Sequence, residues 1–363
     1  MNITFFIDDI TKVGGVESVI TKISTEIVNY ENFNITIVSI FERQRENIYF
    51  NLSSNVKVVY LNKSIPDRGF IKLAKLLETS ILDYINNNKI DILISLYTFN
   101  NFVVAKNRRK INCKIIACQH GQYFADSFKL NLLKKIFWRN FDKVVLLTEE
   151  DRKIYEKFNK NSVVIRNPVR IDKNFRFNIN SKKIVYIGRL STEKSVDYLI
   201  KAFSEINNKF PEWKLIIWGE GEEKENLIKL VEILGIQHNV EFRGFTNNIE
   251  QAYSEAGVIA LTSQTEGLPM LILESKFMGI PVVSFDISTG PKELIQHNID
   301  GILVKKNNTK EFSKALETLI ENDSIRNKIA IEAFKSSDLF DSALIIEQWK
   351  DIFKELTYLE GEN

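Results

Sequence analysis

Two stretches of the chain share one plan, in which a short apolar run leads through a glycine loop into a helical period. In the first, an apolar run at residues 3–7 is followed by a loop with Gly14 and Gly15. In the second, an apolar run at residues 183–187 is followed by Gly188. Further short apolar runs, separated by helical stretches, lie at 35–40, 90–96, 113–118 and 144–147, and again at 214–218, 240–242, 258–261 and 281–285. This alternation predicts parallel α/β sheets whose faces are covered by helices.

A polar, irregular stretch from Asn167 to about Ser181 separates the two halves and is typical of a linker. A chain of 363 residues, 44% hydrophobic, is long enough for two cores. We therefore predict two Rossmann-like doubly wound domains facing a cleft, residues 1–168 and 169–341. Such sheets bind ligands at the carboxyl ends of their strands. The amphipathic tail predicts a C-terminal helix, about 342–363, which is expected to cross back to the first domain.

Composition argues against several classes of protein. Cys113 and Cys118 lack metal-site spacing and are too few for a disulfide framework, so we interpret them as buried core residues. The first nine residues do not resemble a signal peptide, and no apolar run is long enough to span a bilayer. We expect a cytoplasmic protein. Nucleic acid is not an expected partner, because the basic residues are diffuse and no recognition motif occurs.

Charge is unevenly distributed along the chain. Residues 1–170 hold 26 Lys and Arg against 17 Asp and Glu, whereas residues 171–363 hold 23 against 30. The two halves are therefore expected to face different partners. Residues 129–139 mix cations with Leu, Ile, Phe and Trp. This pattern suits a helix at an anionic membrane surface, here the inner face of the cell membrane, although the pattern alone favours a packed surface helix.

Two of the loops after predicted strands suit an anion. At Gly14 and Gly15 the backbone can approach a ligand closely beside a helix N-terminus, although a structural turn is an equal alternative. The full Gly-x-Gly-x-x-Gly pattern is absent, which argues against NAD. Arg189 and Lys194 follow the strand 183–187, and a guanidinium can bind two phosphate oxygens at once. Phosphate binding is favoured here over an exposed pair of cations.

Three other residues lie where predicted strands end. Gly219 and Arg243 follow neighbouring strands and could line a pocket for a flat base, although each alone suits a turn. His120 comes directly after the strand 114–118. A single histidine in this position is as often structural as functional.

The segment from Glu266 to Glu274 holds two carboxylates at helical spacing. Pro269 suits the first turn of a helix, and Glu274 comes about one and a half turns later. Carboxylates accept hydrogen bonds from paired hydroxyls such as those of a ribose or a hexose. The spacing alone favours the plainer interpretation of a helix cap and a solvated glutamate.

Glu266 and Glu274 resemble the Glu-x7-Glu motif of the family-4 retaining glycosyltransferases, which have the GT-B fold. Other segments match the bacterial polysaccharide and glycoconjugate members in the same order: Gly14-Gly15-x-Glu17, Asn167-Pro168-Val169, Gly188-Arg189-Leu190 with Glu193-Lys194, Gly279-Ile280-Pro281-Val282-Val283, and Asp286 with Gly290-Pro291-Lys292-Glu293-Leu294-Ile295. The likeness is strongest over 184–304. Ser195 stands where the family usually has glycine, with a small expected effect because serine can start a helix.

The resemblance implies roles for the matching positions. Arg189 and Lys194 would bind the donor diphosphate with help from the Gly14-Gly15 loop, and Glu274 would hold the ribose hydroxyls. Glu266 would contact the donor hexose together with the backbone of Gly267-Leu268-Pro269-Met270. His120 would lie near the transferred sugar. The implied catalytic set is His120, Glu266, Arg189 and Lys194.

The implied reaction moves a hexose or N-acetylhexosamine from a UDP-sugar to a saccharide or a lipid-linked saccharide, as in capsule or lipopolysaccharide synthesis. The resemblance implies retention of configuration without a metal or other cofactor. The sequence has no Asp-x-Asp, and His120, His238 and His297 show no ligand spacing. Two alternatives stay open. UDP-sugar 2-epimerases share the fold, and a transferase-like subunit could bind a partner without catalysis.

Overall fold

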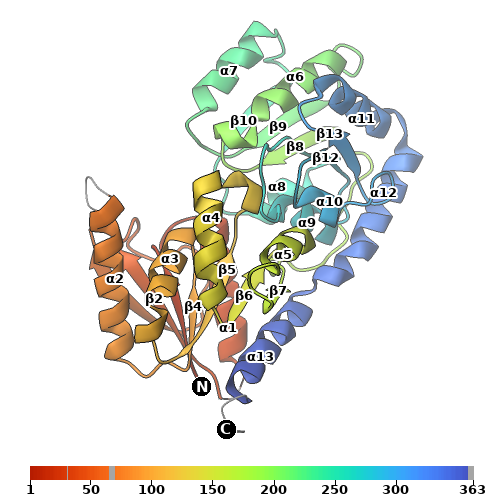
Figure 1. The fold of residues 1–363 in the computed structure, drawn as a ribbon. Helices are drawn as coiled ribbons and strands as arrows, with labels where there is room; N and C mark the ends of the chain where they lie inside the picture. The colour runs from red at the N-terminus through yellow and green to blue at the C-terminus, as the bar shows by residue number, and fades with distance from the viewer. Residues whose placement is uncertain (31, 65–69, 359–363) are drawn as a thin grey trace. The chain divides into compact units, whose positions relative to one another are not determined.

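The computed structural model describes residues 1–30, 32–64 and 70–358. The chain divides into two compact units (Figure 1). Unit 1 contains Met1–Arg170 and Ser342–Asn363, and unit 2 contains Ile171–Asp341. Within the described residues, no helix is both long and apolar enough to cross a membrane.

Unit 1 is a doubly wound α/β unit with a parallel sheet of strand order β3-β2-β1-β4-β5-β6-β7. The strands are β1 Asn2–Ile7, β2 Asn34–Phe41, β3 Lys57–Lys63, β4 Ile92–Ser95, β5 Lys114–Gln119, β6 Lys143–Leu146 and β7 Ser162–Val164. The helices are α1 Gly15–Val28, α2 Phe70–Asn86, α3 Thr98–Lys106, α4 Phe128–Phe137, α5 Glu149–Tyr155 and α13 Ser342–Tyr358, with short 3-10 helices η1 Arg108–Lys110, η2 Tyr123–Ala125 and η3 Trp138–Asn140.

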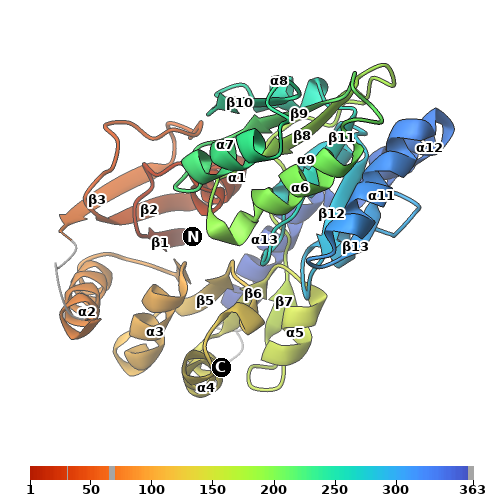
Figure 2. The same cartoon turned by 90° about the horizontal axis from the view of Figure 1, so that it is seen from above.

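Helices cover both faces of the unit 1 sheet. On one face, α1 and α13 pack together and bury Ile23, Trp349 and Phe353 against the strands. On the other face, helices α2 to α5 line the sheet side by side, with Trp138 and Tyr155 fully buried beneath them (Figure 2). The C-terminal helix therefore returns to the first unit, as predicted.

Unit 2 has a second parallel sheet, with strand order β10-β9-β8-β11-β12-β13. The strands are β8 Lys183–Ile187, β9 Lys214–Trp218, β10 Val240–Gly244, β11 Val258–Leu261, β12 Val282–Asp286 and β13 Ile302–Lys305. The helices are α6 Val196–Ile206, α7 Lys224–Ile233, α8 Ile249–Ser254, α9 Met270–Phe277, α10 Pro291–Leu294, α11 Thr309–Glu321 and α12 Asp323–Ser336, with 3-10 helices η4 Thr192–Lys194 and η5 Ser337–Phe340.

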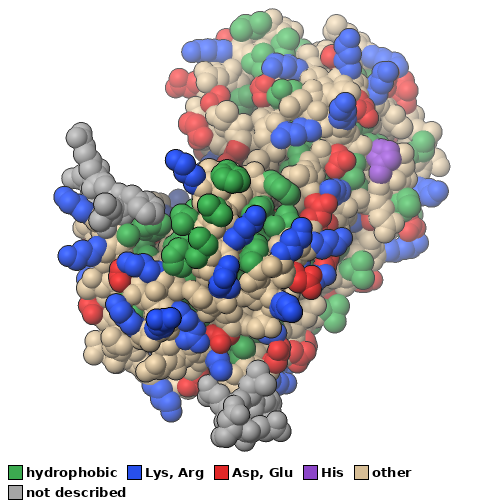
Figure 3. Space-filling view, viewed as in Figure 1, with side chains coloured by type: hydrophobic (Ala, Val, Ile, Leu, Met, Phe, Trp, Pro, Cys, Tyr) green, Lys and Arg blue, Asp and Glu red, His purple; other side chains and the backbone are tan. Residues whose placement is uncertain are grey.

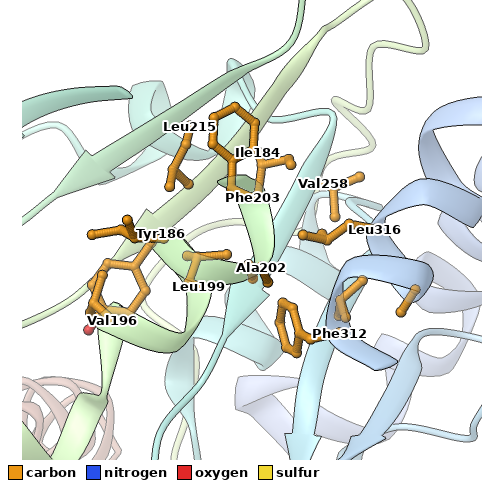
Figure 4. Packing of buried hydrophobic residues seen from close by; sticks show 14 of the residues in the cluster. Ile184, Tyr186, Val196, Leu199, Ala202, Phe203, Leu215, Val258, Phe312 and Leu316 are labelled. Atoms are coloured by element: carbon orange, nitrogen blue, oxygen red, sulfur yellow. The ribbon is translucent and has the colours of Figure 1, made fainter. Parts of the chain in front are cut away.

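The core of unit 2 forms where α6 and α11 pack on one face of this sheet. Ile184 of β8 lies beside Phe203 of α6, Tyr186 lies beside Val196, and Phe312 and Leu316 of α11 complete the layer (Figure 4). Because side chains alternate along a strand, Val185 and Ile259 face the opposite side, where α8 packs on β8 and α9 on β11. Burial on both faces explains why these strands are continuous apolar runs.

Ten predicted strands are confirmed within two residues at each end, and three strands were missed. The missed β3 has a lysine at each end and is half-exposed, β7 has three residues, and the short β13 lies at the edge of its sheet. Both cysteines are buried, as predicted. Residues 171–182 do not run free as a linker, because the backbone N–H groups of Asn174 and Arg176 donate to the carbonyls of Phe277 and Met278.

The strand order reverses once in each sheet, between β1 and β4 in unit 1 and between β8 and β11 in unit 2. Loops that leave adjacent strands in opposite directions open a crevice at the carboxyl ends of those strands. These two places are therefore where a ligand site is expected.

Candidate functional site

The loops after β8 and β11 lie together at the reversal of unit 2. Val258 of β11 pairs with Ile184 of β8, so the carboxyl ends of both strands share one edge. The backbone N–H of Gln264, after β11, donates to the carbonyl of Glu193, after β8, at 2.8 Å. The strand register and this bond hold the predicted cations and carboxylates in one place.

One ion pair joins these two loops, and a second forms within the loop after β8. Lys194 Nζ lies 2.7 Å from Glu266 Oε1, and the two side chains are only 22% and 12% exposed. Arg189 pairs with Glu193 at 2.6 Å and is more exposed. Burial, followed by the charge of Glu266, raises the pKa of Tyr186, whose hydroxyl donates to the carbonyl of Arg189. The structure thus brings Arg189, Lys194 and Glu266 together.

The segment that begins at Glu266 is held by the loop after β12. The hydroxyl of Thr289 donates to the carbonyl of Glu266 at 3.3 Å. Gly290 has a φ of +87°, and a Cβ there would lie 2.9 Å from the Pro269 ring. Pro269 itself is the residue before α9, not in its first turn as predicted, and its carbonyl accepts from Ile272. The N-terminus of α9, with its outward N–H groups, therefore opens directly beside Glu266.

Glu274 lies one turn inside α9 and is 2% exposed. The hydroxyl of Tyr253, on α8, donates to its Oε2 at 2.7 Å. Since Glu266 is also largely buried, the plainer interpretation of a helix cap and a solvated glutamate is excluded. A buried carboxylate that keeps a hydroxyl donor at one oxygen is well suited to accept a ligand hydroxyl as well.

Gly219 and Arg243 have structural contacts. A Cβ on Gly219 would lie 1.8 Å from the carbonyl oxygen of Gly188, so this glycine lets the loops after β8 and β9 touch. The guanidinium of Arg243 binds both oxygens of Glu255 and also Glu241. The structure therefore joins Gly219 to the loop that carries Arg189, whereas Arg243 is taken up by an ion-pair network.

Ser195 has a left-handed backbone, with φ 47° and ψ 47°. Its hydroxyl donates to the carbonyl of Thr192 and makes no cap hydrogen bond to α6. Ser195 is the N-cap residue of α6, so the expectation that serine can start this helix holds for its position but not through a side-chain cap. A left-handed conformation is the physical cause for glycine at such a position, and serine adopts it at a cost of about 1–2 kcal/mol.

Three residues of this site were missed from the sequence. Tyr253 is one, because its contact with Glu274 spans two helices and has no local pattern. The others are Ser191 and Ser263, whose hydroxyls are buried without a partner among the described residues. Both lie in the loops after β8 and β11, a position that a strand-end rule would have found.

The reversal of unit 1 is acidic. Tyr97, after β4, donates its hydroxyl to Glu17, and Asn100 donates to Asp8 at 2.9 Å. Burial raises the pKa of both carboxyls, Asp8 and Glu17. A Cβ on Gly14 would lie 2.3 Å from Glu17 Oε2. A carboxylate thus lies beside Gly14 of the predicted phosphate loop, whereas a Cβ on Gly15 would meet nothing within 4 Å.

His120 follows β5 in unit 1 and borders a small apolar pocket. The pocket is lined by Ile20 and Ile23 of α1, by Trp349 of α13 and by neighbouring strand ends. Its Nε2 is buried and has no hydrogen-bond partner in the part of the chain that the structure describes. Burial lowers the pKa of His120 to about 4, so the imidazole is neutral at physiological pH. It can exchange a hydrogen bond but cannot serve as a cation.

The unit 2 site can therefore bind a ligand that carries both anions and hydroxyl groups. Its cations are compensated by carboxylates, so an incoming phosphate would compete for them. No cluster of three or more His, Cys, Asp or Glu able to hold a metal occurs among the described residues.

Comparison with known sequences supports this chemistry. Residues 170–336 match the family described as "Glycosyl transferases group 1". An uncharacterized glycosyltransferase of Haemophilus influenzae is 30% identical over 358 residues, which cover 96% of this chain and 99% of the relative. The GalNAc-α-(1→4)-GalNAc-α-(1→3)-diNAcBac-PP-undecaprenol α-1,4-N-acetyl-D-galactosaminyltransferase of Campylobacter jejuni is 25% identical over 363 residues, 98% of this chain and 99% of that enzyme.

The fold agrees with this match. The crystal structure of Anabaena HepE in complex with UDP and glucose superposes with a TM-score of 0.78 at 19% identity, covering 97% of this chain and 99% of that one. The architecture is therefore the GT-B fold, as predicted.

Proposed function

The chain belongs to the group 1 glycosyl transferases, and from this premise we propose that it moves a hexose or N-acetylhexosamine from a UDP-sugar to a saccharide or lipid-linked saccharide. The proposed product is part of a bacterial cell-surface glycan. The observation that carries the proposal is the Lys194–Glu266 pair at the strand reversal, beside the start of α9. The complex of HepE with UDP and glucose supports the choice of donor, and the Campylobacter relative, which is named for an undecaprenol-linked saccharide, supports a lipid-linked acceptor.

Arg189 and Lys194 would hold the donor diphosphate. In the structure each cation is paired with a carboxylate, Glu193 and Glu266 respectively. A phosphate that binds Lys194 would displace the carboxylate of Glu266, because both compete for one ammonium group. Donor binding would then release Glu266 to accept from hexose hydroxyls. The ion pair would thus couple diphosphate binding to sugar binding.

Glu274 would accept hydrogen bonds from the ribose hydroxyls. Tyr253 orients its carboxylate by donating to one oxygen, so we assign Tyr253 a positioning role. The N-terminus of α9, with the backbone from Gly267 to Met270, would donate to the sugar or the phosphate.

The proposed reaction breaks the bond between the anomeric carbon and the diphosphate oxygen; the acceptor hydroxyl oxygen bonds to that carbon, and its proton passes to the departing diphosphate. Negative charge grows on the leaving diphosphate. Fixed cations stabilise that charge most when they are placed before the reaction begins. We propose that Arg189 and Lys194 do this without a metal, and that the product keeps the donor's configuration.

His120 stays in the proposed catalytic set. Its neutral imidazole, with an unpartnered and buried Nε2, is ready to form one hydrogen bond with a hydroxyl. Gly14 and Gly15 stay in the proposed donor site: the carboxylate of Glu17 lies beside Gly14, but the space beside Gly15 is open.

A screen of UDP-, GDP- and ADP-sugars with the purified chain, with and without a chelator, tests the proposal. We expect slow hydrolysis or transfer from UDP-sugars alone, unaffected by the chelator and with the donor's anomeric configuration in the product. Epimerisation of a lone UDP-sugar would favour the isomerase alternative. Failure to bind any nucleotide sugar would favour a non-catalytic subunit.

A further inference from the structure

Helix α4 of unit 1 turns large apolar side chains outward. Phe128 is 83% exposed and Leu132 51%, while Phe124, in the preceding turn, is 66% exposed. Ile136 and Leu133 continue the same exposed face. In Figure 3 hydrophobic side chains gather where Figure 1 draws this helix, with Lys and Arg between them. We call Phe124, Phe128, Leu132, Leu133 and Ile136 the α4 face.

Helical geometry explains why these residues share one side. Phe128, Leu132 and Ile136 are four residues apart and form one row along the helix. The opposite side packs on the unit, where Lys134 and Trp138 are fully buried. Lys134 is neutralised there by Asp126 and bonds to the Tyr155 hydroxyl. The inner side of α4 is therefore fully packed and its buried charge is paired, whereas the α4 face is uncovered in the described structure.

In the described part of the chain, unpaired cations flank the α4 face on its own helix, and the acid in the turn before the helix, Asp126, is paired with Lys134. Lys129, Lys135 and Arg139 are exposed on the same helix and its last turn. No Asp or Glu occurs between Ser127 and Phe141. Among the described residues, none of these three cations has a carboxylate partner. The face is thus apolar at its centre and positive at its edges.

An apolar centre with positive edges favours one kind of partner. A second copy would place the same three cations opposite themselves, because a two-fold interface pairs each patch with itself. Protein interfaces are also depleted in lysine at their centres. An anionic bilayer offers hydrocarbon for Phe and Leu and phosphate for Lys and Arg in the same plane. We propose that the α4 face docks unit 1 on an anionic lipid surface, with Phe124, Phe128 and Leu132 entering the headgroup region.

Vesicle co-sedimentation of the full chain tests this proposal without any donor or acceptor. Phosphatidylcholine vesicles with added phosphatidylglycerol should bind the wild type, and pure phosphatidylcholine should bind it much less. The variant Phe128→Ser with Leu132→Ser should bind at least about tenfold more weakly. Replacing Lys129, Lys135 and Arg139 with Gln should weaken binding roughly a hundredfold, since each cation near the surface contributes about fivefold.

Ile233, on α7 of unit 2, provides a matched control because its side chain is 82% exposed. Ile233→Ser should bind vesicles as the wild type does. The proposal is overturned if the wild type ignores anionic vesicles or if all three variants bind alike. It is also overturned if sedimentation velocity shows a wild-type dimer that Phe128→Ser with Leu132→Ser abolishes, because the face would then join two copies.

Discussion

The strand reversals of the two units have the same topology and opposite chemistry. After β8, unit 2 supplies Arg189 and Lys194, and the loop after β11 supplies Glu266. After β1, unit 1 supplies glycines, but the carboxylate of Glu17 lies over Gly14 and is held by Tyr97. The same turn of glycine into a helix thus has a carboxylate beside it in unit 1 and paired cations beside it in unit 2.

The net charge of each half of the chain is opposite in sign to the charges that stand out at its strand reversal. The first half of the chain carries an excess of cations, yet its strand reversal holds buried acids. The second half is acidic overall, yet its reversal holds the paired cations. Many of the basic residues of unit 1 lie elsewhere, including the exposed cations of α4. The location of a charge, and what it pairs with, matters more than the total.

The largest expected effect comes from removing both cations of unit 2. Arg189→Ala with Lys194→Ala should lower kcat by about 10³-fold or more, because each lost donor to developing charge costs about 10²–10³. Initial rates with a UDP-sugar measure this. Lys201→Ala, an exposed lysine of α6 paired with Asp197, is the control and should keep full activity. Near-normal transfer by the double variant would remove the proposed role of both cations.

Separate substitutions of Glu266 and Glu274 by glutamine test whether the two carboxylates have different roles. Glu274→Gln should weaken UDP binding about 10- to 150-fold, because hydrogen bonds to a charged group are worth about 1.5–3 kcal/mol. Glu266→Gln should lower kcat by about 10²-fold with UDP affinity unchanged or slightly higher, since it frees Lys194. Calorimetry and initial rates distinguish the two. Equal effects of both substitutions on UDP affinity would refute the division of roles.

A smaller effect concerns His120 and the stability of unit 1. Its pKa is about 4 in the folded chain against an ordinary 6.5, so the unfolded chain binds the proton first as pH falls. The contribution of neutral His120 to the free energy of unfolding should therefore be complete above pH 6.5 and should decline as the pH falls toward 4. The variant His120→Asn should lose less stability over this range, measured by Tm relative to its own value at neutral pH. His238→Asn, on the surface of unit 2, should decline like the wild type; an unchanged slope in His120→Asn would contradict the prediction.

The smallest effect should come from Glu17→Gln. UDP affinity should change less than about threefold, because the diphosphate is proposed to bind chiefly through Arg189 and Lys194. A marked gain in UDP affinity would show that Glu17 strongly opposes the diphosphate at the Gly14-Gly15 loop. Titration calorimetry at low salt gives the clearest reading, since screening is weakest there.

The architecture was predictable because buried parallel strands are continuous apolar runs with glycine loops at their ends. Half-exposed β3 and three-residue β7 gave no such run and were missed. The motif residues of unit 2 were found because each follows a strand end. Tyr253 was not, since its bond to Glu274 joins two helices that only the packed fold brings together. The left-handed backbone of Ser195 was also hidden, because serine gives no local sign of it.

Titration of UDP into the purified chain in the presence of a chelator tests the central claim most directly, that the strand reversal of unit 2 binds a nucleoside diphosphate through fixed cations. We expect saturable binding at one site in the wild type and in Lys201→Ala. Binding by Arg189→Ala with Lys194→Ala should be at least about tenfold weaker. Equal affinity in all three proteins, or no binding by the wild type, would contradict the claim.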